Sequence, residues 1–397
     1  MNKHSYREPF LCMALLVIMI FEVPFFKLFL ISGAVMLILY TVIYKRHPFI
    51  DVAVVVLILF IVLYFAIDTK LESSTEYKVW YAISTISLYA YGDYMDFDGL
   101  STKERSEKVT SVIKTIAIAY AAFVLVTMVY SIMKGQFAIT RNPLNIWTGT
   151  LRAATHFGTM SLIPLAYGLY LIIATRSKMS HKYGWMLIIF VSLVAIITGS
   201  RTALFLVPIG FIIAYLADIK IQGVFTKKNL NQLLGALILF AFVTVAFLGD
   251  AFGFQTLFYK SQLGQRYLLG YAPTMTEDGR WKKTVFFFEN ISKSLWGGGY
   301  TRSNVGSIHN IYLDVFDLSG IIPFGLLIIF TLIVIGDYRR LRKSASVDDS
   351  TALLLLLICS LTFIQLLLEP VMESVPVMIW CLLLLSLIHI SEPTRLD

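Results

Sequence analysis

The most constraining feature of this chain is a succession of long apolar runs. They fall in blocks of about 17–22 residues, the length that an α-helix needs to cross the hydrocarbon of a bilayer. Of the 397 residues, 57% are hydrophobic and 15% are charged, whereas a soluble globular protein carries about 25% charged residues. A membrane β-barrel would show alternating segments of about ten residues, and the sequence has no such pattern. It therefore predicts an all-α polytopic membrane protein.

We expect about 12 transmembrane helices. Residues 1–249 hold predicted helices 1–9, residues 250–310 form one long extracytoplasmic loop before the tenth helix, and residues 311–384 hold helices 10–12. The predicted spans are 10–26, 28–44, 50–67, 78–96, 110–132, 158–175, 184–199, 202–217, 231–249, 311–336, 352–368 and 371–390.

The two ends of the chain carry separate expectations. Residues 385–397 resemble the translation of a sequencing-library adapter, so we expect native sequence to stop near Leu384 and the last span to be truncated. The first apolar run, 10–26, lacks a small-residue cleavage site and is followed at once by another span. We therefore expect no cleavable signal peptide.

Basic residues cluster before the first span and in every second short connection. Such clusters mark the cytoplasmic side. We therefore expect both chain ends in the cytoplasm and residues 250–310 on the outer face, and we assign the net charge of +8 to topology, with no nucleic-acid partner. The residues are Lys3, Arg7, Lys45, Arg46, Lys103, Arg105, Lys108, Arg176, Lys178, Lys182, Lys220, Lys227, Lys228, Arg339, Arg340, Arg342 and Lys343.

The long loop of residues 250–310 is rich in aromatic residues and glycine, so we expect it to be folded. Within it, Thr284 to Trp296 is predicted to form an amphipathic helix on the bilayer surface. Gly297-Gly298-Gly299 lacks the strand, helix and lysine of a nucleotide-binding loop, and a flexible turn is the better interpretation.

Arginines on the predicted outer face are the first candidate functional residues. Arg201 lies in the tight turn from Thr198 to Thr202 between two spans, where an unpaired guanidinium costs a few kcal/mol. It suits a bidentate contact to a phosphate; the alternative is an interfacial arginine that contacts lipid headgroups. The other outer arginines are Arg141, Arg152, Arg266, Arg280 and Arg302.

His309 is the candidate base, since an imidazole titrates near neutrality and can accept the proton of a hydroxyl. The alternative is that His309 and Asn310 only cap the next helix, and Asp314 can orient the imidazole only if that helix begins after His309. His156, which follows Arg152, is more simply explained by the start of a helix. Cys12, Cys359 and Cys381 all lie in apolar segments and have no metal-site spacing. We therefore expect no metal and no cofactor.

Taken in order, three groups of residues resemble the O-antigen ligase and polymerase family of bacterial envelope glycan assembly. The first is Thr198-Gly199-Ser200-Arg201-Thr202-Ala203. The second lies in the loop, with Gly279-Arg280-Trp281 and Leu295-Trp296-Gly297-Gly298-Gly299-Tyr300. The third is His309-Asn310-Ile311-Tyr312-Leu313-Asp314, running into Leu318-Ser319-Gly320-Ile321. The resemblance covers about residues 157–335. Arg280 stands directly beside Trp281, closer than the family pattern has it, so Arg266 remains a rival for the loop arginine.

The resemblance implies a glycosyltransferase of the bacterial inner membrane that uses a lipid-pyrophosphate donor, with an extracytoplasmic site and no metal. The implied substrate is an oligosaccharide on undecaprenyl pyrophosphate, and the implied partners are membrane lipid and other assembly proteins such as a flippase and a chain-length regulator. Arg201 and Arg280 would bind the leaving pyrophosphate, and His309 would be the base. Residues implied to contact substrate are Arg266, Arg302, Arg152, Trp281 and Tyr312.

The sequence leaves three functions open. The favoured one is a polymerase of the repeat units of a capsule, exopolysaccharide or O-antigen. A ligase that transfers the finished glycan to a lipid or protein acceptor would use the same residues. A transporter of lipid-linked glycan is the alternative of another class; it would place charges in the middle of spans, where the sequence has few.

Overall fold

The structure is a computed structural model, and its helical content agrees with the predicted class. It describes residues 10–24, 28–43, 51–67, 75–94, 97, 100–175, 177–222, 256, 259, 264, 279–369, 372, 381–382 and 384–388. These residues form helices, and the only β-type pairing among them is an isolated bridge between Leu144 and Leu151.

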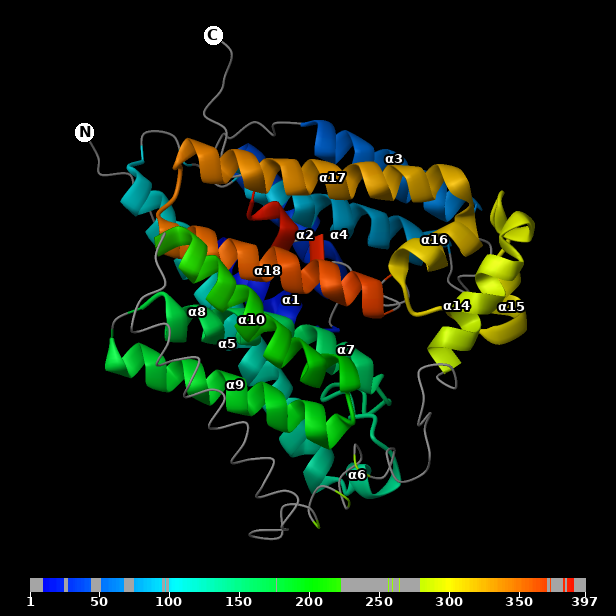
Figure 1. The fold of residues 1–397 in the computed structure, drawn as a ribbon, viewed down its shortest axis with the longest axis horizontal. Helices are drawn as coiled ribbons and strands as arrows, with labels where there is room; N and C mark the ends of the chain where they lie inside the picture. The colour runs from blue at the N-terminus through cyan, green and yellow to red at the C-terminus, as the bar shows by residue number, and fades with distance from the viewer. Residues whose placement is uncertain are drawn as a thin grey trace. The chain divides into compact units, whose positions relative to one another are not determined.

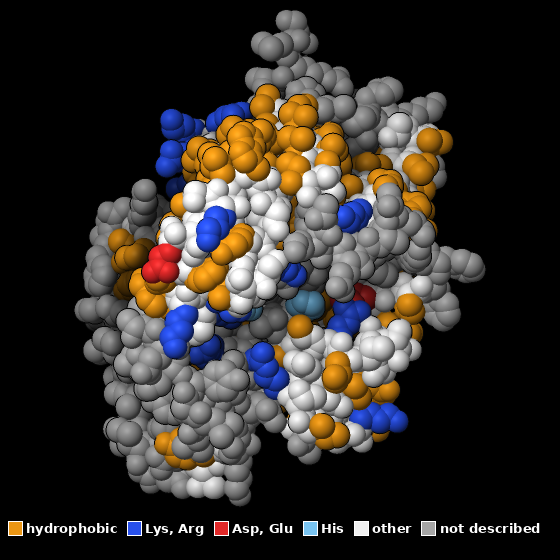
Figure 2. Space-filling model, turned by 90° about the vertical axis from the view of Figure 1, so that its right-hand side faces the viewer, with side chains coloured by type: hydrophobic (Ala, Val, Ile, Leu, Met, Phe, Trp, Pro, Cys, Tyr) orange, Lys and Arg blue, Asp and Glu red, His pale blue; other side chains and the backbone are white. Residues whose placement is uncertain are grey.

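Six helices in this part of the chain are long and apolar enough to cross a membrane, which indicates a helical membrane protein. Figure 2 shows hydrophobic side chains collected in broad uncovered areas, with Lys and Arg side chains gathered elsewhere on the same face. The number of 12 spans stays a prediction, because span 231–249 and most of 371–390 lie outside the described residues. The six are Thr102–Met133, His156–Ile173, Lys178–Thr198, Arg201–Ile219, Ile321–Ser344 and Asp349–Leu368.

The chain divides into two compact units, and the first comprises residues 1–120 and 272–397. Within it α2 packs against α4 and α17 against α3, as Figure 1 shows. Aromatic side chains fill the interior; Tyr89 of α4 meets Phe330 of α17 with ring centroids 5.0 Å apart. The helices before residue 120 are α1 (Phe10–Ile20), α2 (Leu28–Ile38), the π-helix η2 (Leu39–Ile43), α3 (Val52–Ile67), α4 (Thr75–Tyr94) and the first part of α5 (Thr102–Met133). Those after residue 272 are α14 (Gly279–Glu289), the 3-10 helix η4 (Ile291–Ser294), α15 (Tyr300–Val305), α16 (Ile311–Ser319), α17 (Ile321–Ser344) and α18 (Asp349–Leu368).

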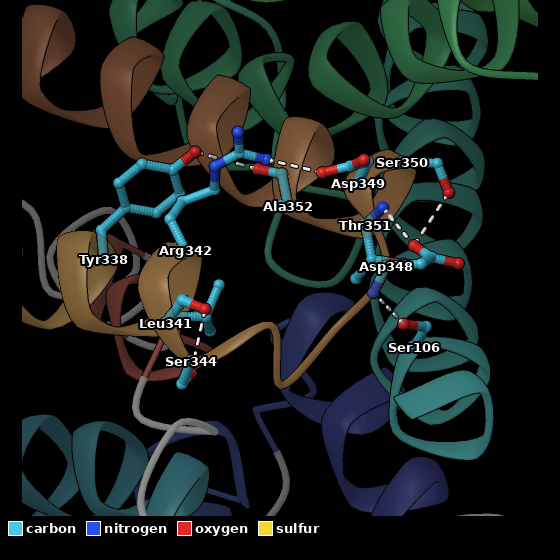
Figure 3. Close-up of polar contacts among 10 residues, drawn as sticks. All are labelled: Ser106, Tyr338, Leu341, Arg342, Ser344, Asp348, Asp349, Ser350, Thr351 and Ala352. Carbon is cyan, nitrogen blue, oxygen red and sulfur yellow. Dashed lines mark hydrogen bonds and ion pairs between the residues drawn. The ribbon is translucent and has the colours of Figure 1, made fainter. Parts of the chain in front are cut away.

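A short turn joins α17 to α18 and is fixed by polar contacts, drawn in Figure 3. Asp348 caps α18 by accepting from the amide of Thr351 at 2.7 Å, and its own amide donates to Ser106 Oγ at 2.7 Å. Arg342 in the last turns of α17 pairs with Asp349 at 3.0 Å. An acidic cap at a helix start and a cation near a helix end both favour the helix dipoles.

The second unit comprises residues 121–271. Its helices are the rest of α5, α6 (Gln136–Ile139), α7 (Ala154–Met160), α8 (Leu162–Ile173), α9 (Lys178–Thr198) and α10 (Arg201–Gln222). All of α8 is buried, and it packs against α9 through two glycines. A Cβ on Gly184 would lie 2.6 Å from the carbonyl oxygen of Gly168, so small residues set this close approach.

The structure differs from two predicted elements of the first unit. The span predicted over 311–336 is two helices, because Gly320 at φ 85° and ψ −172° ends α16 and precedes α17. The amphipathic helix predicted from Thr284 to Trp296 begins earlier, at Gly279, and its α-helical part ends at Glu289. After Asn290 the chain tightens into η4, a 3-10 turn.

Candidate functional site

A glycine turn fastens the loop helices to the junction of α16 and α17. Gly298 and Gly299 donate their amides to the carbonyls of Leu318 and Asp317 at 3.0 and 2.8 Å, and the amide of Ile321 donates to Leu295 at 3.0 Å. A Cβ on Gly320 would lie 2.8 Å from the Leu295 carbonyl oxygen, so only glycine permits this contact. The turn predicted at Gly297–Gly299 is present, but its backbone is tied down by hydrogen bonds.

The buried Asp317 of α16 binds the neighbouring segments of the same region through hydrogen bonds. Asp317 is 1% exposed, and its carboxylate accepts from the amides of Thr301 and Arg302 at 2.8 and 2.9 Å and from Ser294 Oγ at 2.5 Å. A buried carboxylate with three donors is a satisfied charge. It therefore fixes the first turn of α15 and the end of η4 onto α16.

Aromatic packing joins α14 to this framework. Phe287 is 1% exposed and meets Phe316 edge-on, with ring centroids 5.5 Å apart and planes at 89°. Ile308 completes this small core with the two rings. On a neighbouring face, Phe286 stacks on Tyr300 at 6.0 Å. The segment 279–319 is thus packed around its own core.

His309 lies in a strained turn of this segment, just before α16. Its φ is +66°, one of three positive values for non-glycine residues in the described part of the chain. Such a conformation costs about 1 kcal/mol and persists only where the surroundings impose it. Helix α16 begins at Ile311, and Asn310 caps it by accepting from the amides of Tyr312 and Leu313. The helix therefore begins after His309, and the cap is made by Asn310.

Asp314 imposes the strained turn. It is 5% exposed, and one carboxylate oxygen accepts from the amide of Ile308 at 2.8 Å while the other accepts from the amide of Asn310 at 3.2 Å. Ser307 Oγ also donates to this carboxylate at 3.2 Å. The carboxylate thus bonds the backbone on both sides of His309, which holds the residue between them in place.

Lys283 adds a cation to the segment that leads into this turn. It projects from α14, and its Nζ donates to the carbonyl of Ser307 at 3.0 Å, while a Cβ on Gly306 would lie 3.1 Å from the same Nζ. An ammonium has three donors, and the carbonyl takes one. Lys283 was not among the functional residues predicted from the sequence. The available signal was its position three residues after Arg280, which puts both side chains on one face of a helix.

Arg280 has defined partners in the first unit. Its guanidinium donates to the carbonyl of Leu368 at 2.9 Å and to Glu369 Oε1 at 3.1 Å, and the Glu369 side chain is 4% exposed. A cation at the C-terminus of α18 also interacts favourably with the helix dipole. Arg280 therefore joins α14 to α18, and any role in binding pyrophosphate stays a prediction.

The other loop residues selected from the sequence lie on different surfaces. Trp281, the residue after Arg280 in α14, is exposed. Arg302 in α15 is partly exposed. Tyr312 Oη is 2.9 Å from Thr331 Oγ1 of α17. Arg266 lies outside the described residues.

Arg201 belongs to the second unit, in the turn that the sequence predicted. Gly199 ends α9 at φ 62°, and the amide of Ser200 donates to the carbonyl of Ala195 at 2.8 Å. Arg201 is exposed at the first position of α10. Gly158 of α7 packs against this turn, where an added Cβ would lie 3.2 Å from Ser200 Cβ.

Arg152 and His156 flank the start of α7 in the same unit. Arg152 donates its backbone amide to the carbonyl of Pro143 at 2.8 Å, and Asn142 Oδ1 accepts from the amide of Ala154 at 3.1 Å. The segment before α7 is therefore folded back on residues 142–143. His156 lies in the first turn of α7, as a helix start predicts.

Within the described residues, no group of three or more His, Cys, Asp or Glu side chains could hold a metal ion. No known protein family and no curated protein matches the chain.

Proposed function

We propose that this chain is a membrane glycosyltransferase that polymerises polysaccharide repeat units carried on undecaprenyl pyrophosphate, at the outer face of the bacterial cytoplasmic membrane. The observation that carries the proposal is the His309 turn. A histidine is held at a positive φ by a buried carboxylate that bonds the backbone on both sides of it. Structures retain such local strain mainly at functional sites.

The reaction needs a base and cations. The hydroxyl oxygen of the acceptor sugar forms a bond to the anomeric carbon of the donor glycan. The bond from that carbon to the pyrophosphate oxygen breaks, and the lipid pyrophosphate leaves with the electron pair. His309 takes the hydroxyl proton. Since its Nδ1 is buried, Nε2 is the nitrogen assigned to this step.

Cations stabilise the charge that develops on the leaving pyrophosphate. Lys283 is a cation beside the segment that leads into the His309 turn, because its Nζ binds the Ser307 carbonyl two residues before the histidine. Arg280 and Arg302 add charge in the same unit. Arg201 is assigned a phosphate-binding role from the sequence resemblance and from its exposure at the start of α10.

The test is reconstitution of the purified full chain in lipid vesicles with a lipid-linked repeat unit. We expect a ladder of chain lengths with the wild type, and its loss in His309→Asn and Arg201→Ala. Asn tolerates a positive φ, so His309→Asn removes the imidazole and keeps the turn. Matched controls are His181→Asn, whose ring bonds the Thr175 carbonyl, and Arg339→Ala at an exposed position of α17.

Each outcome decides a part of the proposal. A single addition to an acceptor, without a ladder, would indicate a ligase. Full activity of both His309→Asn and Arg201→Ala would remove this mechanism. Movement of intact lipid-linked glycan across the vesicle membrane, without a new glycosidic bond, would indicate that the protein is a transporter and not an enzyme.

A further inference from the structure

Helix α14 has three faces with different surroundings. At about 100° per residue, Arg280, Lys283, Thr284 and Phe287 share one side of the helix. That side is turned to the protein: Phe287 is buried, Arg280 binds Leu368 and Lys283 binds Ser307. Lys282 and Glu289 share a second side, which is exposed and charged.

The third face is apolar and uncovered. Trp281, Val285 and Phe288 follow the spacing i, i+4 and i+7 that places side chains along one helix face, and Phe288 is 57% exposed. Further exposed apolar side chains follow in η4 and in the residues after it, where Trp296 is 75% exposed. We call the set the apolar face of α14; it comprises Trp281, Val285, Phe288, Ile291, Leu295 and Trp296, all exposed.

This face is fastened to the beginning of a candidate transmembrane helix. The carbonyl of Leu295 accepts from the amide of Ile321, the first residue of α17, at 3.0 Å. Ile321 and Ile322 are themselves exposed, and α17 is one of the six helices suited to cross a membrane. The end of such a helix lies at the boundary between hydrocarbon and headgroups, so Leu295 and Trp296 lie at that depth.

The sequence predicted a surface helix over Thr284 to Trp296, and the structure supplies its orientation. We propose that the apolar face of α14 lies in the bilayer interface, in the leaflet where α17 begins, with the lipid surface as its partner. Two tryptophans and a phenylalanine on an exposed face are the composition of an interfacial helix. Lys282 on the adjacent face is exposed and supplies a cation for lipid phosphates. The proposal does not depend on the assigned enzymatic activity.

Helix α14 also contacts the segment that leads into the His309 turn. Its protein-facing side binds Ser307 through Lys283 and the end of α18 through Arg280. These two contacts tie the position of residue 307 to that of α14.

The experiment places one label at a time on the full chain in phosphatidylcholine–phosphatidylglycerol vesicles. All three native cysteines are buried, so the variants Phe288→Cys, Trp296→Cys and Glu289→Cys can be labelled with a small fluorophore against an unlabelled wild-type background. Val285→Cys is a second variant of the apolar face, if Trp296→Cys does not fold. Quenching is measured with brominated lipid and with iodide in the water.

The expected pattern contrasts neighbouring positions. Brominated lipid should quench the label at 288 and 296 at least about twofold more than at 289, because side chains on the apolar side of an interfacial helix enter the acyl boundary. Iodide should quench the label at 289 more strongly than the labels at 288 and 296. If iodide quenches 288 and 296 as strongly as 289, the face is in water and the proposal is wrong. If neither reagent quenches them, a second copy or another protein covers the face, which also overturns it.

Discussion

The two turns that carry His309 and Arg201 are built differently, although both join helices and both contain a residue with a positive φ. The His309 turn is imposed by side chains, chiefly the carboxylate of Asp314. The Arg201 turn is imposed by backbone: Gly199 takes the positive φ, and amides of the turn donate to carbonyls of α9. In the first turn the strained residue is itself the candidate base, whereas in the second a glycine takes the φ and leaves Arg201 in regular helix.

This difference predicts opposite sensitivities. The His309 turn should fail when a side chain elsewhere is removed, and the Arg201 turn should fail when a side chain is added to its glycine. Because every native thiol is buried, a thiol-reactive dye that reports exposure of cysteines on heating can compare the stabilities of all variants in detergent.

The largest effect is expected for Asp314→Ala. The change leaves the buried amide of Ile308 and the amide of Asn310 without their acceptor, which should cost about 3 kcal/mol, since hydrogen bonds to charged groups contribute about 1.5–3 kcal/mol each. Polymer formation should fall with it, because the His309 turn loses its support. The measurements are the thermal midpoint of dye labelling and the rate of ladder formation.

The control for Asp314→Ala is Asp349→Ala. Asp349 makes one ion pair with Arg342 on an exposed side chain, a contact worth about 0–1 kcal/mol. Equal loss of stability in the two variants would contradict the assigned role of Asp314.

A smaller effect is expected for Gly199→Ala. A Cβ at φ 62° costs about 1–2 kcal/mol, so the thermal midpoint should fall. Gly325→Ala is the control, since it lies inside α17, where an added Cβ meets nothing within 4 Å, and should leave the midpoint unchanged or raise it. A Gly199→Ala variant as stable as Gly325→Ala would mean that the backbone does not fix this turn.

The features that were predicted correctly from the sequence are those that depend on a local pattern of residues. Long apolar runs gave the helical membrane class, and Gly199 with the residues after it gave the turn before α10. Asn310 was proposed as part of a helix cap, and it is the cap. The break at Gly320 was missed, because both sides of it are apolar and a glycine inside an apolar run is common in membrane helices.

The sequence did not predict contacts between residues that are far apart in the chain. The sequence does not predict that Glu369 is the partner of Arg280, since the two are 89 positions apart. The sequence predicted that Asp314 could orient the imidazole once the helix begins after His309, but it did not predict that the carboxylate accepts from the amides of Ile308 and Asn310. Lys283 was missed for the same reason, because its significance arises only when α14 packs beside Ser307.

The smallest and sharpest effect is expected for His309→Gly. Glycine adopts a positive φ without the steric cost of a Cβ, so the variant should be more stable than wild type by up to about 1 kcal/mol, while ladder formation is lost with the imidazole. Ala345→Gly is the matched control, because Ala345 also has a positive φ, 50°, at the exposed end of α17; it should gain similar stability and keep its activity. A residue that lowers stability and is needed for activity is retained for function. If His309→Gly gained no stability, or if it kept full activity, the strain at this position would have no functional meaning, and the two turns would differ only in how they are built.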